Sequence, residues 1–316
     1  MLTTFQFKPN DTTTQQAYAG DSIVAIIAGQ MAGAAASRRG PSGPFELSIG
    51  FLAAGALLAS ILWKENVAGG GKPNGKVEKG STTDNDNAND ANEKPTIRAA
   101  IKVIQSDPKI MLVGSVQSLF EAAMYVFVLN WPPAVTDALS TVFAGATTPY
   151  GGVFSCFMAC CLLGSTIFGR STRTKPDGSD GMSAENFAGR MLGLAAVSMG
   201  GATLAASQLL PKAMSSPAAT LATLVGCLFA FEACVGMYFP TIGTLRSKYV
   251  PDSHRSVIMN LFGIPLNVLV VTVFLSIKRL GTNGALGVST AALTLATASM
   301  WKLKKVIAGE KAAGES

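Results

Sequence analysis

One apolar stretch near the middle of the sequence decides the fold class: residues 110–131 read IMLVGSVQSLFEAAMYVFVLNW. A helix needs about 20 predominantly apolar residues to cross the hydrocarbon of a bilayer, and this stretch carries a single charged side chain, Glu121. Seven further apolar segments lie at roughly 22–36, 45–62, 151–169, 187–209, 218–241, 257–277 and 284–300. Because these runs are continuous rather than alternating, they indicate membrane-spanning helices and not barrel strands.

The composition of the whole chain agrees with that reading. Of its 316 residues, 48% are hydrophobic and only 14% are charged, whereas a soluble domain carries about 25% charged residues. Soluble globular, disordered and coiled-coil classes are therefore excluded. The sequence predicts an all-α membrane protein, a helical bundle of about eight transmembrane helices with the lipid bilayer as its surroundings. The net charge of +6 is then a signal of topology and not of nucleic-acid binding.

A polar stretch divides the apolar segments into two before it and six after it. It contains GGG at residues 69–71 and DNDNAND at residues 84–90, a composition that predicts a flexible linker. We expect residues 1–63 to hold two helices, 64–109 to form the linker, and 110–316 to hold six helices with a tail. Lys and Arg gather in the linker, in the tail and in the loops after the fourth and sixth segments, which predicts that both termini are cytoplasmic.

Signatures of enzymes are missing from the sequence. The single histidine, His254, follows the sixth apolar segment in a polar loop, and the five cysteines lie in apolar segments without a C-x-x-C pair. No nucleophile elbow, phosphate-binding loop or dinucleotide fingerprint occurs. We therefore expect no enzyme, no catalytic residue, no cofactor and no metal site.

Two carboxylates, Glu121 and Glu232, lie deep inside apolar segments. A charge near the bilayer midplane is costly, so such a residue is expected to face a cavity or a partner. Both occur in the tripeptide Phe-Glu-Ala, three helices apart, which favours a three-plus-three inverted repeat with a substrate cavity at the midplane. The alternative is that each glutamate only ties helices together.

Other polar side chains in these segments are candidates for the same substrate pathway. Asn260 and Asn267 are seven residues apart and so share one helical face. Each of these groups could equally form an ordinary hydrogen bond between helices. The complete set of candidate pathway residues is Glu121, Glu232, Gln117, Tyr125, Tyr238, Asn260 and Asn267.

Small residues predict where helices approach closely. Gly29 and Gly33 form a G-x-x-x-G pair, as do Gly189 and Gly193. Such pairs let the backbones of membrane helices come together, although ordinary packing would explain any single glycine.

Several motifs resemble the molybdate-anion transporter family of the major facilitator superfamily. They are QSLFEAAMY at 117–125, GVFSCFMA at 152–159, FEACVGMYFP at 231–240, LRSKYVP at 245–251 and MNLFGIPLN at 259–267. The resemblance implies twelve helices, of which this chain would supply helices five to twelve: two from the N-terminal half and the complete C-terminal half. The family usually has an arginine where this sequence has Gly263, and we expect no deep Lys or Arg in the membrane to replace it.

The function implied by this resemblance is secondary active transport of a small oxyanion such as molybdate by alternating access, with proton or ion coupling, in the plasma membrane. Two alternatives stand beside it. One is a truncated membrane protein that does not transport, and the other is a major facilitator for a different small solute.

Overall fold

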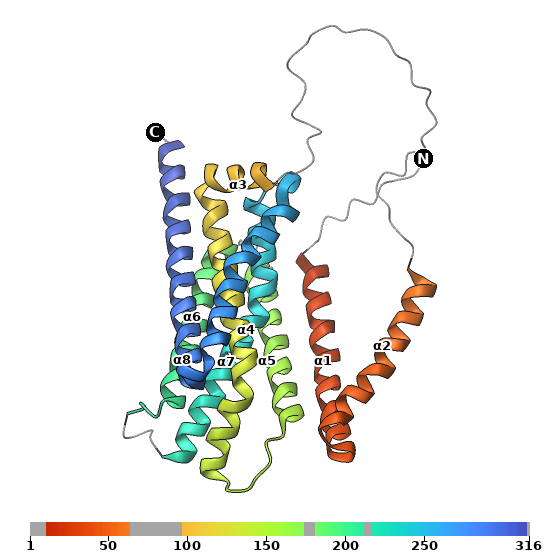
Figure 1. The fold of residues 1–316 in the computed structure, drawn as a ribbon. Coiled ribbons are helices and arrows are strands. Elements are labelled where there is room, and N and C mark those ends of the chain that lie inside the picture. The colour runs from red at the N-terminus through yellow and green to blue at the C-terminus, as the bar shows by residue number, and fades with distance from the viewer. Residues whose placement is uncertain (1–10, 64–96, 174–180, 212–215, 315–316) are drawn as a thin grey trace.

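The computed structural model describes residues 11–63, 97–173, 181–211 and 216–314, and this part of the chain is helical without strands. Figure 1 shows the elements as a bundle of upright helices with one short helix lying across its upper end. The helices are α1 (Asp11–Arg39), α2 (Gly43–Leu62), α3 (Ile97–Ser106), α4 (Pro108–Val142), α5 (Tyr150–Thr172), α6 (Ala184–Ala206), α7 (Pro217–Tyr249) and α8 (Arg255–Gly314), with short 3-10 turns at Gly40–Ser42 and Asp252–His254.

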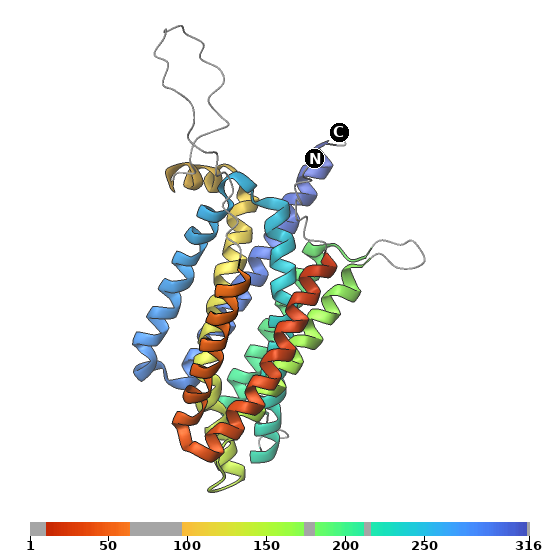
Figure 2. The same ribbon diagram turned by 90° about the vertical axis from the view of Figure 1, so that its right-hand side faces the viewer.

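Six helical stretches in the described residues are long and apolar enough to cross a membrane. Two of them reverse direction once. The stretch Gly20–Leu62 turns at Gly40, where φ is +69°, and α8 turns at Gly281, where φ is +64° and ψ is 179°. Glycine tolerates this positive-φ backbone because it has no Cβ. Figures 1 and 2 show the antiparallel pair on each side of both turns. The predicted helical membrane bundle is confirmed, and the two turns divide the six stretches into eight helical segments in the described residues.

The predicted flexible linker needs a correction at its C-terminal end. Residues 97–106 form α3, although we placed them in the linker 64–109; residues 64–96 lie outside the described part. Apolar residues at Ile97, Ala100, Ile101 and Ile104 recur at helical spacing, and Ala100 is buried in a cluster with Ile110, Val250, Ile258 and Phe262. The neighbouring Asn- and Asp-rich residues hid this short period. Asp107 then caps α4, since its side chain accepts a hydrogen bond from the Lys109 amide at 2.8 Å.

The centre of the bundle holds four aromatic side chains from α4 and α7. The rings of Phe120 and Phe231 lie 5.9 Å apart, Phe120 lies 4.0 Å from Tyr238, and Phe127 lies 5.1 Å from Phe231. Phe120 and Phe127 are seven residues apart, as are Phe231 and Tyr238, so the two cross-contacts mirror each other. Because α4 and α7 run in opposite directions (Figure 1), this is the arrangement of a pseudo-two-fold axis between them. It supports the predicted inverted repeat.

Glycines set two close helix contacts. Gly29 and Gly33 of α1 pack against Gly151 of α5, and Ser155 donates a hydrogen bond to the Ile26 carbonyl at 3.0 Å. The close approach predicted for the first G-x-x-x-G pair is therefore confirmed. The prediction is wrong for the second pair, because a Cβ built on Gly193 would meet nothing within 4 Å. Between α5 and α7, Gly236 lies directly against the Cys161 backbone.

Candidate functional site between helices α4 and α7

A polar cluster links α4 and α7 next to the aromatic centre. The Arg246 guanidinium donates to Glu121 through Nη2 at 3.0 Å and to Gln117 through Nε at 2.9 Å. The Tyr238 hydroxyl donates to the same Glu121 oxygen at 2.9 Å. We call these four residues, Gln117, Glu121, Tyr238 and Arg246, the Arg246 cluster. Its charged side chains are only 27% (Arg246) and 19% (Glu121) exposed, so this ion pair is largely removed from solvent.

Helix geometry explains why these residues meet. Gln117 and Glu121 are one turn apart on α4 and therefore lie on the same face. Tyr238 is fixed by its stacking on Phe120, with an angle of 12° between the rings, and it is fully buried. Its hydroxyl is thereby held beside Glu121. The structure thus brings together three of the predicted pathway residues.

The position of Arg246 corrects the sequence interpretation. We assigned it to the loop after segment 218–241 and expected no deep cation in the membrane, whereas α7 continues to Tyr249. Side chains of a helix lean toward its N-terminus, so Arg246, near the C-terminal end of α7, reaches back into the bundle to Glu121. The signal in the sequence was the need of a carboxylate inside an apolar run, Glu121, for a partner.

The second predicted carboxylate has different surroundings. Glu232 is 5% exposed, and among the described residues no hydrogen bond or ion pair reaches it. The next turn of α7, at Gly236, packs tightly on Cys161 of α5. Glu121 and Glu232 occupy the same tripeptide, yet only Glu121 has a cationic partner in the described structure.

The pseudo-two-fold register shows how this difference arises. In the register that pairs Phe120 with Phe231, Glu121 corresponds to Glu232. The three partners of Glu121 correspond to Leu228 (for Gln117), Phe127 (for Tyr238) and Val135 (for Arg246). All three counterparts are apolar and buried. Each polar partner on one side of the axis is therefore matched by an apolar residue on the other.

Three other candidates do not join the Arg246 cluster. Tyr125 is 49% exposed, and Asn260 and Asn267 are exposed on α8. Among the described residues none of the three is hydrogen-bonded to the cluster. The alternative role that we considered for polar side chains is realised by Ser118, whose hydroxyl donates to the Phe262 carbonyl at 2.7 Å and so ties α4 to α8.

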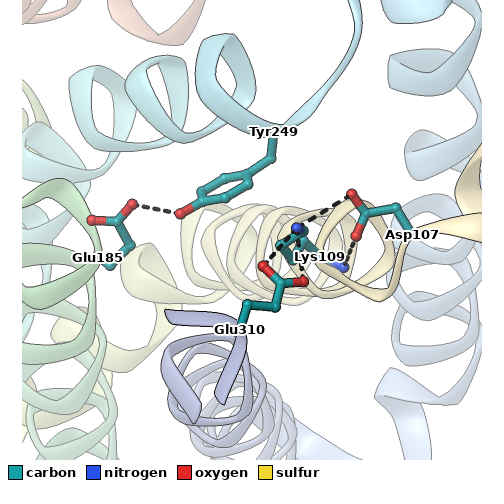
Figure 3. A network of polar contacts seen from close by, with 5 residues as sticks. All are labelled: Asp107, Lys109, Glu185, Tyr249 and Glu310. Carbon is teal, nitrogen blue, oxygen red and sulfur yellow. Dashed lines mark hydrogen bonds and ion pairs between the residues drawn. The ribbon is translucent and has the colours of Figure 1, made fainter. Parts of the chain in front are cut away.

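A second polar network, which sequence reasoning missed, lies at the end of the bundle near α3. Figure 3 shows its contacts between Glu185 and Tyr249 and between Lys109 and Glu310. Glu185 of α6 accepts hydrogen bonds from Lys248 and Tyr249 of α7, both at 2.6 Å. Lys109 of α4 binds both carboxylate oxygens of Glu310 in α8 at 2.9 Å. The first contact joins α6 to α7, and the second joins α4 to α8. We call them the end network.

The fold defines a class of protein: a helical membrane bundle, here with an ion pair between two of its helices. A family model described as sugar transporters with 12 transmembrane helices matches residues 7–232. The chain belongs to this family of the major facilitator superfamily.

Three relatives of this chain carry the narrower name molybdate-anion transporter. The chain is 27% identical to a molybdate-anion transporter of Takifugu rubripes over 82% of this chain and 51% of the relative. It is 25% identical to the molybdate-anion transporter of Xenopus tropicalis over 81% of this chain and 48% of the relative. The relative from Danio rerio is 30% identical over 54% of this chain and 31% of its own length. The chain thus spans about half the length of the first of these relatives. No solved structure matches it.

Proposed function

We propose that this chain is part of a secondary active transporter, without enzymatic activity, that moves a small oxyanion such as molybdate across a membrane by alternating access. The names of its relatives support an inorganic anion as the substrate. The observation that carries the proposal is the Arg246 cluster, which places a guanidinium inside the helical bundle.

An oxyanion that leaves water needs a cation or hydrogen-bond donors in compensation. Arginine suits this task because its planar fork of donors matches the oxygens of an oxyanion, and such bonds are strong. In the structure this fork is occupied by Glu121 and Gln117. We infer that Glu121 acts as an internal counter-ion, which the incoming anion displaces from Arg246.

This exchange offers a route to coupling. A carboxylate displaced from its cation inside the bundle is costly, and binding of a proton removes that cost. Anion binding at Arg246 would then favour proton uptake by Glu121, which gives symport of an anion with a proton. Glu232, which already lacks a cationic partner among the described residues, is a second candidate for proton uptake.

Alternating access would use the pseudo-two-fold axis between α4 and α7. The end network would close the six-helix half on one side of the membrane, and its ion pairs would break when that side opens. In this proposal α1 and α2 belong to the N-terminal half, residues 110–316 form the C-terminal half, and both termini face the cytoplasm at the plasma membrane.

A second candidate substrate is a sugar or another neutral solute. The description of the matching family favours it, and the hydrogen-bonding groups of Gln117 and Tyr238 could serve a hydroxylated ligand as well. Competition separates the two: an excess of unlabelled molybdate should block uptake of an oxyanion, whereas an excess of hexose should not.

The test is uptake of labelled molybdate by cells that express the complete protein and lack other molybdate uptake. We expect Arg246→Gln to lower uptake at least tenfold and Glu121→Gln to change its dependence on external pH. Arg279→Gln is the matched control, because Arg279 is exposed on α8 and takes part in no ion pair within the described structure. Normal uptake by Arg246→Gln would overturn the proposed site. Absence of uptake in the unaltered protein at the cell surface would favour a non-transporting membrane protein.

A further inference from the structure

A groove of about 590 Å³ lies between α3, α4 and α8 at the end of the bundle that carries the end network. Its size falls in the range of small-molecule sites, but its wall is almost entirely apolar. The side chains that dominate it come from all three helices: Ile101, Ile104, Met111, Leu119, Phe262 and Leu269.

The few polar groups of the groove do not suit a water-soluble substrate. The Ser118 hydroxyl is already used by the carbonyls of Gly114 and Phe262. The Ser115 hydroxyl donates to the Met111 carbonyl of its own helix. Apart from the exposed amide of Gln105, an oxyanion or a sugar would find no free polar group there to replace its hydration, so the occupant must be largely apolar where it contacts the groove.

Helix α3 supplies the roof of the groove and has the character of an interfacial helix. Figures 1 and 2 both show it lying across the bundle axis, beside the end of α4. Ile97 and Ile101 are 62% and 40% exposed, although they are strongly apolar. A helix with an exposed apolar side and basic residues beside it lies in the plane of a membrane surface, at the level of the headgroups.

The basic residues of α3 lie on the side of the helix next to the residues that line the groove. Arg98 and Lys102 are one turn apart, and Gln105, which lines the groove, follows on the same side of the helix. Both cations are exposed, and neither takes part in an ion pair within the described part of the chain. The groove is therefore apolar inside and positively charged at its edge.

We propose that this groove binds a phospholipid with an anionic headgroup. One acyl chain would lie along Ile104, Met111 and Phe262, and the headgroup would contact Arg98 and Lys102. Lysine and arginine near a membrane surface attract anionic lipids, each adding a factor of about five in affinity. The shared charge of the two cations is what separates this site from unselective lipid contact along the bundle.

The test uses the complete protein, purified in a mild detergent and titrated with dioleoyl phosphatidylserine or dioleoyl phosphatidylcholine. Native mass spectrometry then counts the bound lipids. We expect one lipid to bind before the others, with a preference for the serine lipid of roughly tenfold to thirtyfold. Arg98→Gln/Lys102→Gln should abolish that preference. Lys278→Gln/Arg279→Gln removes the same charge at the other end of the bundle and should leave it unchanged.

A second variant tests the groove itself. Ser115→Trp places an indole in the groove and should reduce first-site binding of both lipids, with an unchanged elution volume in size-exclusion chromatography as the check on folding. Two results would overturn the proposal. One is full serine-lipid preference in Arg98→Gln/Lys102→Gln. The other is unchanged first-site binding in well-folded Ser115→Trp, which would mean that another part of the protein fills the groove. Neither readout depends on transport.

Discussion

The ion pair between Glu121 and Arg246 should couple α4 to α7 energetically, and a double-mutant cycle can measure that coupling. The perturbations are Glu121→Gln, Arg246→Gln and the two together. Each keeps a side chain of similar size and a hydrogen-bonding amide. The cycle therefore isolates the charge–charge contribution, provided that neither single variant creates a new contact.

The structure sets the magnitude. At 3.0 Å between Nη2 and Oε1, and with an effective dielectric constant of about 20, the attraction is about 5 kcal/mol. Desolvation of both charges offsets much of it. Because both side chains keep some exposure, at 27% and 19%, we expect a net coupling of about 1.5–3 kcal/mol, the range of hydrogen bonds between charged groups.

The assay is reversible unfolding of the purified protein in mixed micelles, with increasing denaturing detergent and helical circular dichroism as the signal. Arg246→Gln should lower the stability, because it leaves Glu121 without its cation. Adding Glu121→Gln to this variant should cost less stability than Arg246→Gln alone costs. The matched control is the pair Arg39–Glu46. It is shorter, at 2.7 Å, but its side chains are 69% and 49% exposed, so its coupling should be close to zero. Equal coupling in the two pairs would refute the argument that burial strengthens the Arg246 cluster.

Two further predictions use the same unfolding assay. Gly236→Ala should destabilise the protein by about 1–3 kcal/mol because the added methyl group meets the backbone of α5. Gly243→Ala, in the same helix, meets nothing within 4 Å and should be neutral or stabilising by up to about 1 kcal/mol; equal effects would contradict the close contact. Glu232→Gln should leave stability unchanged or raised, since it removes a chargeable group that has no partner among the described residues. A loss above about 1 kcal/mol would reveal a partner.

The sequence was sufficient for the membrane bundle because the length of an apolar run is a local property. The hydrophobicity of residues 110–131 is enough to predict a membrane-spanning helix. The repeated Phe-Glu-Ala indicated the axis at which Phe120 and Phe231 meet. Helix α3 was missed because its short apolar period is embedded in a polar region, where average composition conceals it.

The site was only partly predictable because its contacts join residues far apart in the chain. Gln117, Glu121 and Tyr238 stood out as polar groups inside apolar runs. Arg246 did not, because near a helix end a cation looks like part of a loop until the direction of its side chain is known. The end network is harder still: Lys109 and Glu310 are both charged residues of the polar boundary, and nothing local indicates that they bind each other.

The two identical tripeptides differ in chemistry because different side chains surround them. A two-fold axis gives Glu121 and Glu232 equivalent backbone positions, so their difference must come from the side chains around them. On one side Gln117, Tyr238 and Arg246 surround the carboxylate; on the other, the corresponding positions hold Leu228, Phe127 and Val135. Restoring a cation at the last position tests this directly. If Glu232 cannot reach the new side chain, Val135→Arg should destabilise the bundle, because an unpaired charge replaces a buried valine. If Glu232 and the new arginine pair, the further change Glu232→Gln should then cost stability that it does not cost in the unaltered protein.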